Sequence, residues 1–142
     1  MARLALVHDD DAPPAEVKAV VDGLDAYNRS CVGPEDGTPL RLFLRDEQGA
    51  VAGGLLAYAL FGWMFVQILW VDGRWRGEGY GEALLRRAEE EARARGCGWI
   101  WLDTFTFQAP GFYRKLGYEE FARLDDFPAG HARIYFKKRL DA

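Results

Sequence analysis

The sequence has few of the residues that build metal centres and disulfide frameworks. It contains two cysteines and two histidines among 142 residues. The cysteines, Cys31 and Cys97, are spaced neither like a metal-binding pair nor like part of a disulfide framework. We therefore expect no bound metal, and we interpret Cys97, at the start of an apolar run after Gly96, as a buried thiol.

Long apolar runs and a surplus of basic residues are also missing. No segment approaches the ~20 apolar residues of a membrane span. The apolar stretch near the N-terminus is too short for a secretory signal. The net charge of -4 provides no basic stripe for nucleic acid. We expect a cytoplasmic protein whose partners are neither membranes nor nucleic acids.

The length and the hydrophobic fraction of 49% predict one domain over residues 1–142 with a packed core. Hydrophobic periodicity predicts helices over residues 15–29, 82–95 and 109–116. It predicts strands over residues 3–8, 40–45, 50–58, 61–71, 99–105, 118–124 and 131–138. The order is typical of an α/β protein, and the β-α-β stretch from residue 61 to residue 105 implies a parallel pair of strands.

A glycine-rich turn joins the strand at residues 61–71 to the strongest helix. Gly77, Gly79 and Gly81 alternate along it and allow the backbone to curl tightly. The amides of such a turn, together with the positive end of the helix, suit a pyrophosphate. Arg74 and Arg76 add positive charge. A glycine-rich connection without a ligand is the alternative. The turn has neither the G-x-G-x-x-G order of a dinucleotide fold nor a P-loop lysine.

Two motifs resemble those of the GNAT superfamily of N-acetyltransferases. Residues 76–81 read Arg-Gly-Glu-Gly-Tyr-Gly, similar to the superfamily's Gln/Arg-x-x-Gly-x-Gly/Ala between a strand and a helix. Residues 109–118 read Ala-Pro-Gly-Phe-Tyr-Arg-Lys-Leu-Gly-Tyr, similar to its second motif after the next strand. The resemblance implies a mixed sheet of about six or seven strands. It also implies that the parallel fourth and fifth strands splay apart and that about four helices flank the sheet.

The resemblance also implies where acetyl-CoA binds. Its pantetheine arm would enter the gap between the splayed strands, and its pyrophosphate would rest on the glycine-rich turn. The residues expected to contact it are Leu69, Val71, Arg76, Gly77, Glu78, Gly79, Tyr80, Gly81, Thr106 and Phe112. Thr106 stands where the superfamily often has asparagine, so that contact is left open between Thr106 and Gln108.

Transfer of an acetyl group to an amine raises two proton problems. The leaving thiolate needs a proton, and Tyr113 is the expected general acid because a phenol stays protonated at neutral pH. The amine must lose a proton, yet Gln67 stands where many relatives have a glutamate on the strand. Asp103, His131 and a chain of waters are the three alternatives for the base.

The acceptor is expected to be a primary amine of a small molecule, a peptide or a protein, attacking acetyl-CoA directly. The polar candidates for binding it are Tyr27, Asn28, Asp125 and Asp126. A CoA-binding module without catalysis is the alternative function, favoured by Gln67 and opposed by Tyr113. The resemblance adds a homodimer as an expectation.

Overall fold

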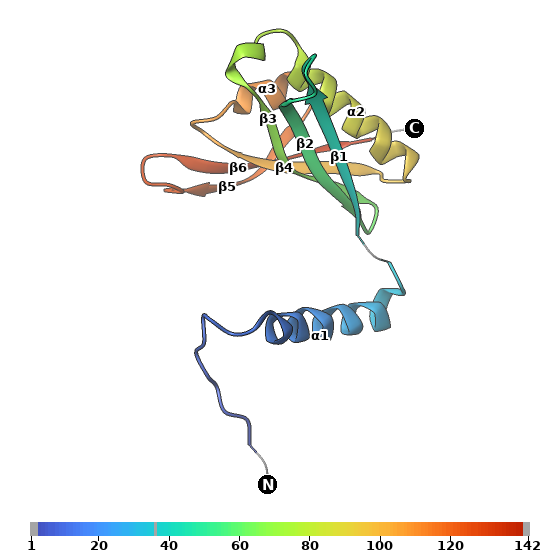
Figure 1. Ribbon diagram of the computed structural model, residues 1–142, viewed down its shortest axis with the longest axis vertical. Coiled ribbons are helices and arrows are strands. Elements are labelled where there is room, and N and C mark those ends of the chain that lie inside the picture. Colours follow the sequence, from blue (N-terminus) through green and yellow to red (C-terminus); the bar gives the residue numbers. More distant parts are fainter. Residues whose placement is uncertain (1–2, 36, 141–142) are drawn as a thin grey trace. The chain divides into compact units, whose positions relative to one another are not determined.

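The computed structural model describes residues 3–35 and 37–140 and divides into two compact units, the first of which ends at Glu35 (Figure 1). The first unit contains one helix, α1 (Pro14–Val32), which covers the helix predicted over residues 15–29 and begins at a proline. None of the residues of α1 is buried. Every residue predicted to act in catalysis or to bind acetyl-CoA belongs to the second unit.

The expected strand at residues 3–8 is wrong. These residues have no regular secondary structure. A strand is defined by the neighbour that takes its backbone hydrogen bonds, and residues 3–8 pair with no strand among the described residues. Their short apolar stretch is therefore not enough to specify a strand.

The second unit is built on one six-stranded sheet with the order β1-β2-β3-β4-β6-β5. Its strands are β1 (Thr38–Arg45), β2 (Val51–Leu60), β3 (Trp63–Val71), β4 (Trp99–Phe105), β5 (Glu119–Asp125) and β6 (Ala132–Arg139). All neighbours are antiparallel except β3 and β4, which run parallel. The mixed sheet and its parallel pair are confirmed.

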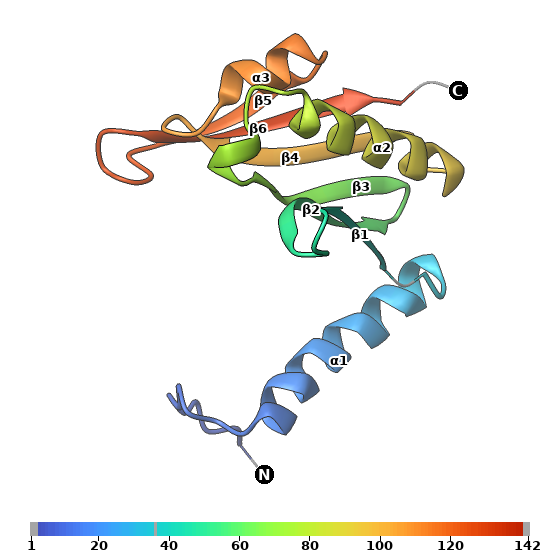
Figure 2. The same cartoon turned by 45° about the horizontal axis from the view of Figure 1, so that its top comes forward.

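Helix α2 (Tyr80–Ala94) makes the crossover from β3 to β4 and packs on the sheet (Figure 2). Its buried face includes Leu85, Ala88 and Ala92, the stripe that helical spacing predicts. A short helix, α3 (Pro110–Lys115), precedes β5, and one 3₁₀ turn, η1 (Gly73–Trp75), follows β3. The described residues thus form three α-helices and one 3₁₀ turn, against about four helices expected.

A buried polar cluster ties α2 to the other end of the chain. Glu89 of α2 is 2% exposed and accepts hydrogen bonds from Tyr118 Oη at 2.8 Å and from Lys138 Nζ at 3.1 Å. Lys138 Nζ also donates to the Leu116 carbonyl oxygen at 2.9 Å. The cluster therefore fixes the C-terminal end of α3 against α2 and β6.

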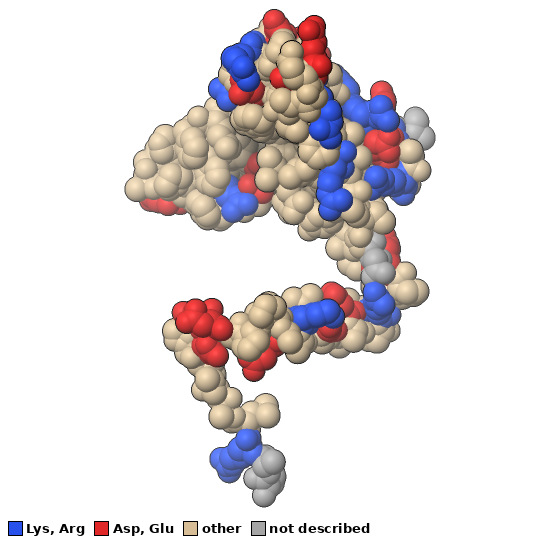
Figure 3. Space-filling model, in the orientation of Figure 1, with Lys and Arg blue, Asp and Glu red and all other residues tan. Residues whose placement is uncertain are grey.

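On the face of the second unit that Figure 3 shows, acidic and basic side chains both occur, and a broad part of that face carries neither. None of the helices among residues 3–35 and 37–140 has both the length and the apolarity that crossing a membrane requires.

Candidate active site

The site begins where β3 bends away from β4. In the antiparallel pairing with β2, Ile68 lies opposite Leu56 and Val66 lies opposite Ala57, so Gln67 is an extra residue without a partner. Such a β-bulge bends a strand and increases its twist. Parallel pairing with β4 stops at the same place, with Val66 opposite Leu102, and the two strands diverge beyond it (Figure 1). The bulge at Gln67 thus coincides with the start of the splay.

A pocket of about 1010 Å³ occupies the space that the splay creates. Its walls come from residues 67–71 of β3, from the turn and the start of α2, from the end of β4 with the following loop, and from Phe112 and Tyr113 of α3. The β3 edge at residues 67–71 has no strand partner on its β4 side within the described part of the chain. An extended ligand in the pocket can therefore hydrogen-bond to that edge.

The three glycines of the turn serve different needs. Gly77 and Gly79 have φ of 79° and 86°, in the left-handed region that favours glycine. Gly79 is the N-cap of α2, and no side chain caps the helix there. Gly81 lies beside α3, where an added Cβ would be 3.4 Å from Phe112 Cζ, at van der Waals contact. The uncapped helix start leaves amide donors for an anion.

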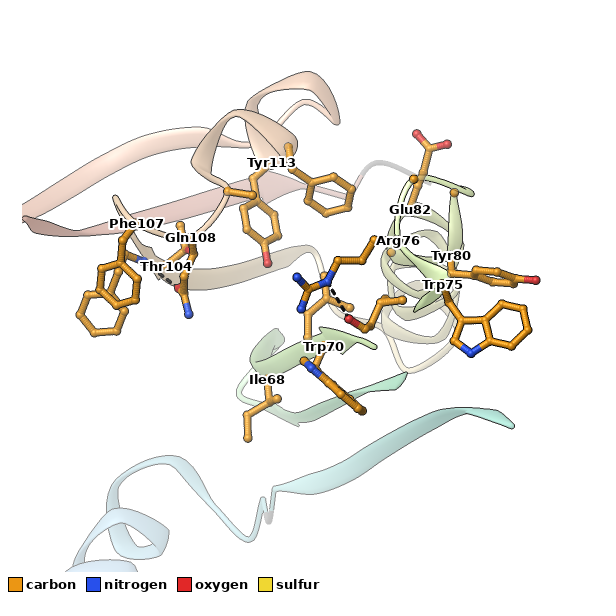
Figure 4. Close-up of a pocket in the computed structure, with 18 of the residues that line it drawn as sticks. Ile68, Trp70, Trp75, Arg76, Tyr80, Glu82, Thr104, Phe107, Gln108 and Tyr113 are labelled. Carbon is orange, nitrogen blue, oxygen red and sulfur yellow. Dashed lines mark hydrogen bonds between the residues drawn. The ribbon is translucent and has the colours of Figure 1, made fainter. Parts of the chain in front are cut away.

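The two arginines of the turn are held by local hydrogen bonds. Arg76 Nε donates to the Val71 carbonyl oxygen at 3.0 Å, and Figure 4 shows its guanidinium at the pocket. Asp72 accepts from the Arg74 backbone amide at 3.0 Å, and this hydrogen bond holds the pKa of Asp72 below its usual value. The turn therefore presents ordered positive charge on its Arg76 side.

The hydroxyl of Tyr113 points into the middle of the pocket (Figure 4). Its ring packs on Phe112, Tyr118 and Phe136 at centroid distances of 5.1, 6.0 and 5.9 Å. Burial, with a smaller contribution from the charge of Asp103, raises the pKa of Tyr113 to about 12. The phenol is therefore protonated at neutral pH and can donate its proton.

Asp103 and His131, the two candidate bases, lie in different surroundings. Asp103 lines the pocket, and its Oδ1 accepts a hydrogen bond from Arg133 Nε at 2.8 Å. This hydrogen bond is the largest reason why the pKa of Arg133 is raised. His131 is exposed and does not line the pocket. Its Nδ1 lies 3.2 Å from Thr106 Oγ1.

The pocket brings together most of the residues predicted to bind acetyl-CoA. Its lining includes Leu69, Val71, Arg76, Gly77, Gly79, Tyr80, Gly81 and Phe112, and also Tyr113 and Asp103. Glu78 and Thr106 are not among the lining residues, whereas Gln108 is. The Thr106 hydroxyl instead accepts from the Ala132 amide at 3.0 Å, at the start of β6.

The structure does not gather the expected acceptor-binding residues around this pocket. Asp125, the last residue of β5, and Asp126, which follows it, are exposed and do not line it. Tyr27 and Asn28 belong to α1 in the first unit. All four assignments stay predictions.

Several pocket residues were not predicted from the sequence. Trp75, Phe105 and Phe107 line the pocket, and Arg133 holds Asp103. The sequence does carry one signal, because Phe105 ends the strand that the splay exposes and Phe107 lies two residues beyond it. In residues 3–35 and 37–140, no cluster of three or more His, Cys, Asp or Glu side chains is arranged to hold a metal ion.

A mixed sheet with one splayed parallel pair, a glycine turn at its edge and a tyrosine in the gap together define an acetyltransferase of the GNAT type. The chain belongs to this family, since the model of the acetyltransferase (GNAT) family matches residues 7–118. It is 35% identical to the acetyltransferase Atu2258 of Agrobacterium fabrum, over 94% of this chain and 98% of that protein. It is 37% identical to blasticidin-S acetyltransferase of Streptomyces morookaense, over 99% of this chain and 98% of that protein. A crystal structure of an acetyltransferase from Agrobacterium tumefaciens matches it with a TM-score of 0.89 and 34% identity, covering 96% of this chain and 99% of that one.

Proposed function

We propose that this chain transfers an acetyl group from acetyl-CoA to a primary amine of a small molecule, by direct attack of the amine within a ternary complex. The observation that carries the proposal is that one pocket contains both an anion-binding helix start and a protonated tyrosine hydroxyl. The first suits the diphosphate of CoA, and the second suits the sulfur that leaves.

The proposed reaction uses few protein groups. The amine nitrogen attacks the thioester carbonyl carbon, the carbon–sulfur bond breaks, and the acetyl group ends on nitrogen as an amide. Tyr113 gives its hydroxyl proton to the departing sulfur. Because the pKa of Tyr113 is about 12, the phenolate left behind quickly regains a proton from water.

We propose that Asp103 accepts the proton that the amine loses. It lines the pocket, and its charge contributes to the raised pKa of Tyr113, so it lies within electrostatic reach of the reacting atoms. Arg133 occupies Oδ1 and fixes the carboxylate, which leaves Oδ2 for an ammonium group. His131 is the weaker candidate because it lies outside the pocket lining.

Asp103→Asn tests this role. The variant keeps a hydrogen-bond acceptor for Arg133 but has no carboxylate to attract the ammonium group or take its proton. We expect kcat/KM for amines to fall by about 100-fold, with an unchanged Kd for acetyl-CoA measured by calorimetry. A retained kcat/KM would assign proton removal to His131 or to water instead.

A small-molecule acceptor is supported by the relative named for blasticidin S, which this chain matches over almost its whole length. Amines of peptides and proteins are the alternative acceptors. A screen that measures thiol release from acetyl-CoA with a panel of amines decides between them.

The central test compares the wild type with Tyr113→Phe. Removal of the hydroxyl leaves the ring packing intact but deletes the proton donor, so kcat is expected to fall by about 10²-fold. The Kd for acetyl-CoA should not change. If CoA binds to the wild type and no amine releases thiol, the chain is a CoA-binding module without catalysis.

A further inference from the structure

The pocket continues past Tyr113, away from the glycine turn. Figure 4 shows Trp75, Arg76 and Tyr80 on one side of the Tyr113 hydroxyl and Thr104, Phe107 and Gln108 on the other. If the diphosphate of the acetyl donor lies at the turn and its sulfur at Tyr113, the remaining end of the pocket faces the acyl group and the attacking amine. This argument rests on the proposed function.

An aromatic ring with free surface stands at this end. Phe107 is 55% exposed and lines the pocket. It stacks on Phe105 with a centroid distance of 5.2 Å and an interplanar angle of 13°, and the His131 ring packs edge-on against it at 5.2 Å. Phe105 in turn packs on Phe127 at 5.5 Å. The surface of Phe107 that these contacts leave exposed can stack with a flat group.

Arg133 holds this aromatic cluster in place. Its guanidinium lies 5.7 Å from the ring centre of Phe105 and 5.4 Å from those of Phe127 and Tyr135. It also pairs with Asp103 at 2.8 Å. The charge of Arg133 is thus paired and packed among rings, so it orders the cluster that supports Phe107.

Beside the ring, one amide group has a fixed orientation. Gln108 Oε1 accepts two hydrogen bonds, from Thr104 Oγ1 at 2.8 Å and from the Phe105 backbone amide at 2.9 Å. Both partners lie on the β4 side of Gln108, so the NH₂ group of the amide is on its pocket side (Figure 4). An oriented NH₂ group recognises a hydrogen-bond acceptor on a ligand.

We infer that Phe107 and Gln108 form an acceptor subsite for a flat ring that carries a hydrogen-bond acceptor, attached to the amine that is acetylated. The ring stacks on Phe107, and its ring nitrogen or carbonyl oxygen accepts from the Gln108 amide. The amine then extends from the ring toward the acetyl group near Tyr113.

Three amine probes separate the two contacts. 4-(Aminomethyl)pyridine has a flat ring with an acceptor nitrogen, benzylamine has the ring alone, and isobutylamine has neither. Binding of each to the complex of the protein with CoA is measured by calorimetry, and KM is measured where thiol release from acetyl-CoA occurs. The wild type is expected to bind the pyridine amine tightest and isobutylamine weakest.

Two substitutions test the residues singly. Phe107→Leu should weaken the binding of both ring-bearing amines by about fivefold and leave the affinity for isobutylamine unchanged. Gln108→Glu keeps an oxygen for Thr104 and Phe105 but replaces the donor with an acceptor. The added negative charge acts on all three ammonium groups alike, so binding of the pyridine amine should weaken relative to that of the other two. The matched controls are Phe43→Leu, at an exposed phenylalanine of β1, and Gln48→Glu, in the exposed turn after β1.

The outcomes distinguish this inference from the proposed function. Equal affinity for the three probes, including no measurable affinity for any, overturns the inference, as does a Gln108→Glu variant that weakens all three alike. Failure of the protein to bind acetyl-CoA, or of a broad amine panel to release thiol, overturns the proposed function instead.

Discussion

At the scale of single residues, the pKa of Tyr113 determines up to which pH the proposed proton donor keeps its proton. Its raised pKa means that the phenol keeps its proton well above neutral pH. The attacking amine gains reactivity as it loses its own proton on the same rise in pH. Under the proposed mechanism, the donor and the nucleophile would therefore both be in their reactive forms in alkaline solution.

We predict that kcat/KM increases from about pH 7 to about pH 10 without a falling limb due to Tyr113. A group with its pKa at about 12 loses its proton only near that pH, so the donor persists throughout this range. The measurement is a pH–rate profile of thiol release. A falling limb below pH 10 that disappears in Tyr113→Phe would show that the tyrosine ionises too early for the role given to it.

At the scale of elements, the position of α3 depends on the buried polar cluster of Glu89, Tyr118 and Lys138. Lys138 has side-chain exposure of 18% and has Glu89, 2% exposed, as its ion-pair partner. Tyr118 also packs against Tyr113, at a centroid distance of 6.0 Å. Burial and Glu89 raise the pKa of Tyr118, so its hydroxyl remains a donor to the carboxylate.

Glu89→Gln is expected to lower the free energy of unfolding by about 3 kcal/mol, because it leaves the Lys138 ammonium buried without a countercharge. Glu91→Gln is the matched control on the same helix. Its partner Arg87 is exposed, so the cost should stay below about 0.5 kcal/mol. Urea denaturation measures both. Equal costs would mean that the buried pair adds nothing beyond ordinary surface pairing.

Elements with a strong local signal were the ones that the sequence predicted well. α2 follows from its helical spacing of apolar residues, and β1 and β2 follow from two apolar runs around a short turn. The strand predicted over residues 3–8 is wrong because a strand needs a partner, which a short apolar stretch does not supply.

The sequence predicts only those parts of the candidate site that lie within its two motifs. The motifs led to the glycine turn and Tyr113, and both line the pocket. The bulge at Gln67 was not predicted because it depends on the register between β2 and β3. The pairing of Asp103 with Arg133 joins β4 to β6, 30 residues apart, and no local pattern encodes such a contact.

At the scale of the whole molecule, the chain divides into a helical unit and a sheet unit. The family match over residues 7–118 includes parts of both. That residues 1–142 form one domain stays a prediction. Calorimetry tests it, because a single cooperative unit unfolds with equal calorimetric and van't Hoff enthalpies.

A ligand that binds only the folded protein raises its stability by mass action. We predict this effect for acetyl-CoA bound at the glycine turn. At 100 times its Kd, acetyl-CoA should add about 2.7 kcal/mol and raise the Tm by about 8 °C in a thermal unfolding scan. ATP and NAD at the same concentration should raise it less, because neither has an arm to pair with the open edge of β3.

Gly79→Ala should abolish most of this shift in Tm. The added Cβ meets no atom within 4 Å, but φ of 86° strains alanine, so the turn relaxes and its amides lose their common focus. A full shift in Gly79→Ala, or one of equal size with ATP, would mean that the turn is not the site that selects CoA.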